Sequence, residues 1–251
     1  IGSGTGVGHT VTVANIDNTT AGFSVSNTCV LLSGIIAGAT INTTGDIATG
    51  TCVAVSASPA AGSGAINMSV NGGNGDVYWC AGAASMIVFG GATTMNLTCR
   101  DIYSPRVGTP NGYATILVNG VGAAATLNIT ARNVLPGTVS SIGGGSGYGG
   151  ILNLSTNATV NLTVSGSVNG ASGAVSNMPG ASNYSTGTFN IYGIARGGTS
   201  TGSNCPGFYN HSTGLATVTT AIASNGPNGS EGYQFGTVQN TTAGYITVDS
   251  S

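Results

Sequence analysis

Short segments in which apolar side chains alternate with Thr, Asn or Ser recur along the whole chain, and this alternation constrains the fold more than any other feature. In residues 158–164, three apolar side chains share one face of an extended strand, whereas Asn161 and Thr163 share the opposite face. A period of two residues, rich in Val, Ile and Thr, is typical of half-buried strands. The chain is therefore expected to be all-β. The other segments of this kind are residues 10–13, 51–55, 65–70, 113–118, 125–130, 188–192, 215–219 and 243–248.

The boundaries of these segments predict how the strands are arranged. Asn-Gly, Gly-Gly and Pro separate them, as in antiparallel sheets, so we expect an antiparallel β-sandwich or jelly roll. No fixed repeat length is visible, and a solenoid is not expected. The Gly-rich stretch 135–150 is the candidate boundary between a Cys-rich β domain (residues 18–135) and residues 136–251, a second β domain or a continuation of the same sandwich. The alternative is one large domain with a long surface loop.

The charge content excludes several classes of protein. The chain has four basic residues, all Arg, six acidic residues and a net charge of -2, while 40% of its residues are hydrophobic. Disorder through high charge, a basic nucleic-acid surface and a polybasic membrane patch are therefore not expected. The longest near-apolar stretch, residues 30–41, is interrupted by Ser33 and two glycines, so no transmembrane segment is expected. The start at Ile1 fits a mature secreted product, although a fragment boundary would look the same.

A nearly uncharged surface needs another source of solvation, and N-glycans are the expected one. Half of the Asn residues begin Asn-x-Ser/Thr acceptors, about twice the share that chance predicts; composition alone is the alternative explanation. Covalent N-glycans are the non-protein groups that we expect, and no cofactor is expected. Scarce carboxylates also favour an acidic extracellular medium, where they lose their charge. The expected glycosylation sites are Asn18, Asn42, Asn67, Asn96, Asn128, Asn153, Asn157, Asn161, Asn183, Asn210, Asn228 and Asn240.

The five cysteines suggest disulfides rather than a metal site. None has zinc-type spacing with another Cys or with His. The short loops favour the pairs Cys29–Cys52 and Cys80–Cys99 with Cys205 unpaired, and the other pairings of the first four stay open.

Catalytic residues are difficult to identify, and we do not expect an enzyme. Asp17, Asp46 and Asp76 stand in turn-like contexts, and neither His9 nor His211 belongs to a nucleophile motif. Arg100 could pair locally with its neighbour Asp101. No partner is visible in the sequence for the other arginines, which are Arg106, Arg132 and Arg196. Trp79 is expected to pack in the core.

The N-terminal segment, residues 1–17, combines a Gly-rich tether with a single strand-like element. Such a strand could complete the sheet of a neighbouring subunit and produce a head-to-tail polymer, with Val11 and Val13 buried. Pairing within its own chain is the alternative. The candidate donor-strand residues are Thr10, Val11, Thr12, Val13, Ala14 and Ile16.

With its lysine-free, sequon-rich β composition and its opening Val/Thr strand, the chain resembles the subunits of glycosylated surface threads of thermoacidophilic archaea. The resemblance implies β-sandwich subunits joined by an N-terminal donor strand. The expected function is thus a structural subunit of an extracellular, cell-surface filament, a homopolymer that also contacts other cells or surfaces. A non-polymerising adhesin or surface-layer accessory protein is the alternative, and a secreted glycan-processing enzyme is a weaker one.

Overall fold

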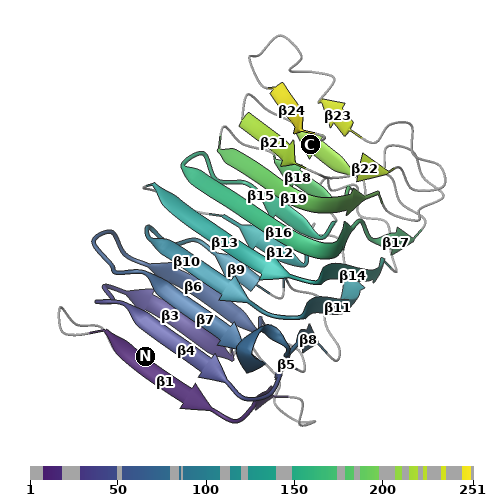
Figure 1. Cartoon of the computed structure of the whole chain (residues 1–251). Coiled ribbons are helices and arrows are strands. Elements are labelled where there is room, and N and C mark those ends of the chain that lie inside the picture. Colours follow the sequence, from purple (N-terminus) through teal and green to yellow (C-terminus); the bar gives the residue numbers. More distant parts are fainter. Residues whose placement is uncertain are drawn as a thin grey trace.

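The computed structural model shows an all-β chain whose strands are stacked in a parallel β-solenoid (Figure 1). It describes residues 8–18, 29–49, 53–79, 85, 87–107, 114–119, 124–139, 149–173, 179–183, 187–197, 207–210, 215–219, 223–224, 233–235 and 245–249. Each strand pairs in parallel with the strand that occupies the same position one turn earlier, as β4 pairs with β1 and β7 with β4. The expected antiparallel β-sandwich or jelly roll is therefore wrong.

The strands form three rows, of which the first two belong to one 16-stranded sheet and the third is a separate eight-stranded sheet. The first row contains β1 (His9–Val13), β4 (Ala39–Thr43), β7 (Ile66–Val70), β10 (Thr94–Thr98), β13 (Ala125–Ala131), β16 (Ala158–Asn169), β19 (Thr188–Arg196), β21 (Leu215–Thr219) and β24 (Tyr245–Asp249). The second row contains β2 (Ile16–Asn18), β5 (Ile47–Thr49), β8 (Val77–Trp79), β11 (Asp101–Val107), β14 (Asn133–Val139), β17 (Ser172–Gly173) and β22 (Ala223–Ser224). The third row contains β3 (Val30–Gly34), β6 (Val55–Pro59), β9 (Ile87–Phe89), β12 (Ile116–Val118), β15 (Ile151–Asn153), β18 (Ala181–Asn183), β20 (Phe208–Asn210) and β23 (Tyr233–Phe235).

The long strands β16 and β19 connect the first two rows. The beginning of β16 pairs with β13, whereas its later residue Val168 pairs with Val134 of β14. The register between β16 and β19 shifts between Thr163 and Ser167, which is where β16 passes from one row to the next. A short 3-10 turn, η1 (Asn71–Gly73), makes the same corner between β7 and β8.

Residues in register are separated by roughly 30 positions, a spacing typical of solenoids. The spacing is not constant, because the loops between rows differ in length, and no fixed period is therefore visible in the sequence. Each register position becomes a column that runs along the solenoid. Along one inward column of the first row, for example, Leu97 pairs with Met68 on one side and with Ile129 on the other, and all three are buried.

The core consists of these stacked apolar columns from all three rows. Outward residues alternate with buried ones, as in β13, where Leu127 and Ile129 are buried and Thr126 and Asn128 are half-buried. The alternation predicted from the sequence is correct, whereas the predicted antiparallel pairing is not. Phe189 and Phe208 pack edge to face across the interior, with ring centroids 5.5 Å apart.

Two sequence-predicted boundaries can be placed on this fold. β14 spans the position between residues 135 and 136, and the sheet continues on both sides of it. The N-terminal strand β1 pairs in parallel with β4 of its own chain, from His9 opposite Ala39 to Val13 opposite Thr43. Within the residues that the structure describes, no helix has the length and apolar character that a membrane crossing requires.

A disulfide is contradicted within the described residues, where no cysteines lie at disulfide distance. Cys52, Cys80 and Cys205 lie outside that part, so each predicted pair, Cys29–Cys52 and Cys80–Cys99, includes one cysteine that the structure does not describe. Cys29 sits one residue before Val30, which pairs with Val55, so the solenoid register brings Cys29 opposite Ala54 rather than Cys52. Its thiol contacts the carbonyl oxygen of Ala48 at 3.8 Å.

Cys99 is buried and stacks in an apolar column. It follows Thr98, which pairs with Ser69 and Thr130, so its own neighbours in register are Val70 and Ala131. Burial, followed by the negative charges of Asp76 and Asp101, raises the pKa of the Cys99 thiol well above its usual value. Cys99 therefore behaves as a small core residue.

Candidate functional site

The most regular surface of the molecule is the outward side of four successive first-row strands, which we call the outer Thr/Asn face. Each strand carries Thr, Asn and Thr at alternate positions, except that β19 ends the pattern with Tyr192. The strands pair in exact register, with Asn128 between Asn96 and Asn161. Side chains of one kind are therefore repeated at the strand spacing of about 4.8 Å. The face consists of Thr94, Asn96, Thr98, Thr126, Asn128, Thr130, Thr159, Asn161, Thr163, Thr188, Asn190 and Tyr192.

The central column of this face is a continuous ladder of amide hydrogen bonds. The Nδ2 group of each Asn donates to Oδ1 of the Asn on the previous strand, at 2.8 Å for Asn96 to Asn67 and 2.7 Å for each later pair. The three inner amides, Asn96, Asn128 and Asn161, both donate and accept in the ladder and are thereby fixed in orientation. The ladder contains Asn67, Asn96, Asn128, Asn161 and Asn190.

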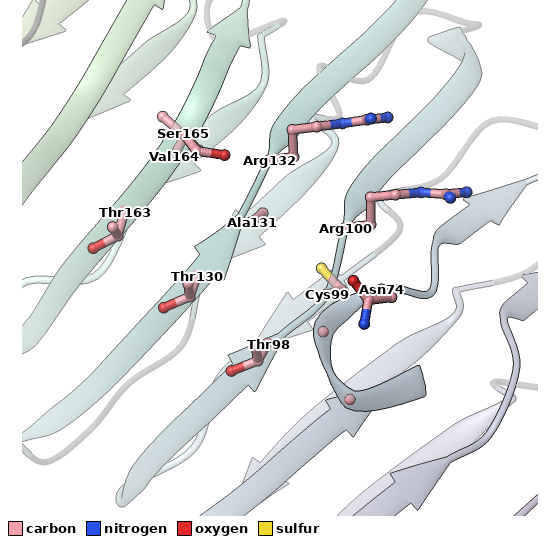
Figure 2. Close-up of a pocket in the computed structure, with 12 residues that line it drawn as sticks. Asn74, Thr98, Cys99, Arg100, Thr130, Ala131, Arg132, Thr163, Val164 and Ser165 are labelled. Carbon is pink, nitrogen blue, oxygen red and sulfur yellow. The ribbon is translucent and has the colours of Figure 1, made fainter.

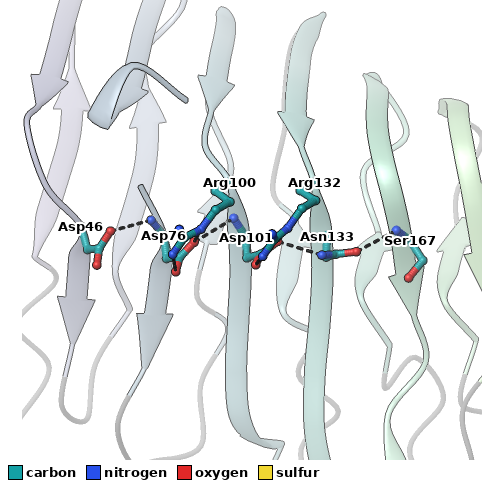
Figure 3. Close-up of polar contacts among 7 residues, drawn as sticks. All are labelled: Asp46, Asp76, Arg100, Asp101, Arg132, Asn133 and Ser167. Carbon is teal, nitrogen blue, oxygen red and sulfur yellow. Dashed lines mark hydrogen bonds and ion pairs between the residues drawn. The ribbon is translucent and has the colours of Figure 1, made fainter. Parts of the chain in front are cut away.

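A second polar ladder lies at the corner between the first and second rows (Figure 3). The Asp76 amide donates to Oδ1 of Asp46 at 2.8 Å, and the Asp101 amide donates to Oδ1 of Asp76 at 3.2 Å. Asn133 continues the series, because its Nδ2 group donates to Asp101 at 2.9 Å and its Oδ1 accepts from the Ser167 amide at 3.0 Å. Asp46, Asp76 and Asn133 therefore each accept a backbone N–H of the next turn, as a capping group would, whereas Asp101 accepts the side-chain amide of Asn133.

Two arginines neutralise this corner ladder. Arg100 forms a two-point ion pair with Asp76, and Arg132 forms one with Asp101, in each case with the acid of the previous turn. The expectation that Arg100 pairs with its neighbour Asp101 is wrong, because Arg100 reaches Asp76 while the Asp101 carboxylate is bonded to Arg132 and Asn133. Partial burial opposes ionisation of Asp101, but hydrogen bonds from Arg132 and Asn133 together with the Arg132 charge lower its pKa. The hydrogen bond and charge of Asp76 raise the pKa of Arg100 in turn.

An open groove of about 570 Å³ lies between η1 and the ends of β10, β13 and β16 (Figure 2). Thr98, Thr130 and Thr163 line it side by side on successive strands, and Arg100 and Arg132 stand at its edge. Both arginines are already paired with carboxylates. In the described residues no group of three or more His, Cys, Asp or Glu is arranged to hold a metal ion.

The structure separates the predicted glycosylation sites into distinct environments. Four of them belong to the amide ladder, namely Asn67, Asn96, Asn128 and Asn161. Asn153 and Asn183 are fully buried, and Nδ2 of Asn153 donates to Oδ1 of Asn183 at 3.0 Å. Asn157, in contrast, is exposed in the turn before β16. Asn42 is half-buried, whereas Asn18 and Asn210 lie in β2 and β20 and Asn228 and Asn240 fall outside the described residues.

The other candidate residues are scattered. His9 begins β1 and is exposed, Asp17 lies in β2, and Asp249 ends β24. His211 and Glu231 lie outside the described part of the chain. In β1, Val11 and Val13 are half-buried, whereas Thr10 and Thr12 are exposed.

Sequence reasoning missed both ladders. The available signal was the motif Thr-x-Asn-x-Thr at residues 94–98, 126–130 and 159–163, which recurs at solenoid spacing. The same motif contains Asn-x-Thr, which by itself predicts a series of glycan acceptors. No family model, curated protein or solved structure matches this chain.

Proposed function

We propose that this chain is a structural subunit of an extracellular filament, in which solenoids stack head to tail through their terminal strands. The observation that supports this is the open edge at β1. Among the described residues, β1 is paired on one side alone, and its inward residues Val11 and Val13 remain half-exposed, whereas their counterpart Ile41 on β4 is 2% exposed. An unpaired parallel edge with a half-covered core is a template for another strand.

The strand suited to this edge is β24 of a second copy. In the register that runs through the first row, Val11 and Val248 belong to one column, and Thr10 and Thr247 belong to the neighbouring column. A second copy that continues the stack would place Val248 beside Val11 in the same parallel pairing. The polymer would therefore be a longer solenoid, formed by strand addition at an edge rather than by insertion into a sandwich groove.

Pairing at the β1 edge would gain both apolar burial and backbone hydrogen bonds. Covering the remaining half of Val11 and Val13 contributes about 1 kcal/mol each, since full burial of Val is worth about 1.5–3 kcal/mol. The backbone bonds along a five-residue strand contribute about 0.5–1.5 kcal/mol each net. Because β1 is already ordered by β4, less chain entropy is lost on pairing than for a free tether.

An extracellular location and N-glycans belong to the same proposal. The low charge of the chain supports both, since a surface with a net charge of -2 needs other solvating groups. The exposed turn site Asn157 is the described acceptor best placed to carry a glycan, because a glycan there would project away from the sheets.

Cysteine cross-linking tests the stacking directly. Thr10 and Thr247 lie at opposite ends of one solenoid, but they become register neighbours when two copies stack. Such neighbours fall within the Cα separation of about 4.4–6.8 Å that a disulfide allows. Under oxidation, the double variant Thr10→Cys/Thr247→Cys should give a ladder of covalent multimers on a non-reducing gel. Each single variant is the control and should give at most the background of the wild type. A double variant that stays monomeric would contradict the proposal.

A further inference from the structure

The outer Thr/Asn face is a two-dimensional grid. Neighbouring strands are about 4.8 Å apart and successive outward residues of one strand about 6.6 Å apart. Four strands in continuous register, β10, β13, β16 and β19, carry the grid without an insertion between Thr94 and Thr98 or their counterparts. Ladder bonds of 2.7–2.8 Å hold the central column in place.

The side chains of this grid are unusually rigid for a surface. Thr is branched at Cβ, so that its hydroxyl and methyl groups occupy few rotamers. The Asn amides are fixed by their neighbours, and Asn128 both donates to Asn96 and accepts from Asn161. A ligand that matches the grid would therefore bind without the entropy cost of ordering these side chains.

The chemistry of the face restricts the ligand. None of its residues is ionisable near neutral pH, and the nearest arginines, Arg100 and Arg132, are paired with acids beyond the strand ends. A charged ligand therefore has no counter-charge here. The face also offers little aromatic surface on which a sugar ring could stack, since Tyr192, at the border, is its single aromatic residue.

We propose that the outer Thr/Asn face binds the surface of ice. Ice presents a neutral, regularly repeating lattice of hydrogen-bond donors and acceptors, with repeats comparable to the spacings of this grid. The Thr hydroxyls and the outward amide groups supply hydrogen bonds at lattice intervals, and the Thr methyl groups lie in the hollows between them. The inference does not depend on stacking, although stacking would continue the central register column through Thr247 and Thr10.

The proposal requires an uncovered face. Ladder residues Asn96, Asn128 and Asn161 use their amide nitrogen, the atom that a glycan would occupy, as a donor to the Asn of the previous strand. Glycans on side chains about 4.8 Å apart would also collide. These three sites are therefore expected to be unmodified in the native protein.

The test measures growth of ice crystals in the presence of the purified 251-residue chain. The wild type should inhibit ice recrystallisation and lower the freezing point below the melting point. Thr130→Tyr, in the exposed column at one side of the face, should raise the concentration required for inhibition by about tenfold, which corresponds to a loss of about 1.4 kcal/mol. Ser58→Tyr is the matched control, because Ser58 is exposed on β6 in the third row, and it should have no effect.

Several outcomes would overturn the inference. A folded wild type that leaves ice growth unchanged, or a Ser58→Tyr variant as impaired as Thr130→Tyr, would exclude this face as an ice-binding surface. A native glycan on Asn128 would do the same. Binding to insoluble chitin or cellulose that is lost in Thr130→Tyr, without any effect of the wild type on ice, would assign the face to a polysaccharide instead. Circular dichroism of both variants confirms that the solenoid is intact.

Discussion

At the scale of single residues, asparagine links neighbouring strands in two different environments. Along the outer Thr/Asn face it links strands on the surface, whereas Asn153 and Asn183 do so in the interior, where both are 0% exposed. A buried amide costs free energy unless its donors and acceptors are satisfied. Asn153 meets this requirement by donating to Asn183 and accepting from the Ser155 amide, each at 3.0 Å.

Replacing the buried amide should destabilise the fold. Asn153→Ala would leave the Ser155 amide and the Asn183 oxygen without these bonds, at about 1–3 kcal/mol for each buried group left unsatisfied. The control is Asn67→Ala at the exposed end of the outer ladder, where a change within about 0.5 kcal/mol is expected. Urea unfolding followed by circular dichroism measures both. Equal losses of unfolding free energy would mean that burial of the Asn153 amide does not increase the cost of removing it.

The corner ladder predicts how stability depends on pH. Since the pKa of Asp101 is lowered in the folded chain, ionised Asp101 stabilises the fold. This contribution is complete above the ordinary value of 3.8 and is lost as the pH falls from there through the lowered pKa. The urea midpoint of the wild type should therefore decrease over this acidic range.

Two variants assign this dependence to the ladder. Asp101→Asn cannot titrate, and Arg132→Gln removes the charge that lowers the Asp101 pKa, so both should show a weaker decrease of the urea midpoint below pH 3.8. If both variants follow the wild-type profile, the pH dependence originates elsewhere in the chain.

At the scale of elements, the long strands β16 and β19 each continue from the first row into the second row without a break. β19 does so at Gly193, whose φ of +133° is accessible to glycine and strained for other residues. A Cβ atom added there would lie 2.2 Å from the carbonyl oxygen of Val164 on β16. The backbone conformation and the close approach of two strands thus coincide at the same corner.

Gly193→Ala should destabilise the protein by more than the conformational cost of about 1–3 kcal/mol. Gly62→Ala separates the two causes, because Gly62 also has a positive φ, +84°, but nothing within 4 Å of the added Cβ. We expect the larger decrease in unfolding temperature for Gly193→Ala. A decrease equal to that of Gly62→Ala would show that β16 and β19 shift apart at little cost.

At the scale of the whole molecule, stacked columns replace a conventional two-layer core. Each turn contributes one side chain to each column, and a turn is stabilised mainly by its neighbours. The two terminal strands of the first row, β1 and β24, are therefore the natural places for association, as proposed above. The same geometry determines which glycan acceptors remain accessible.

Glycopeptide mapping of the native protein should distinguish two neighbouring acceptors. Asn157 is exposed and should be occupied, while Asn153 is buried and should be bare. An intact mass close to the 24.3 kDa of the polypeptide would contradict glycosylation as the source of solvation. A modified Asn153 in folded protein would contradict the burial described above.

Which side chains point inward can be predicted from the sequence. In β16, the alternation of Val160, Asn161 and Leu162 predicts the observed burial, because successive side chains of any strand point to opposite faces. The sequence also determined the scarcity of charge and hence the neutrality of the outer Thr/Asn face. These properties depend on local composition and on the geometry of a single strand.

Which strands pair, and in which direction, is visible only in the tertiary structure. Parallel and antiparallel strands share the same period of two, and turns of unequal length concealed the solenoid spacing. Arg100 reaches Asp76 across 24 positions, and Arg132 reaches Asp101 across 31, so neither ion pair could be found from neighbours in the sequence. The register that stacks one turn on the next depends on contacts about 30 residues apart, and this register creates both ladders and the grid.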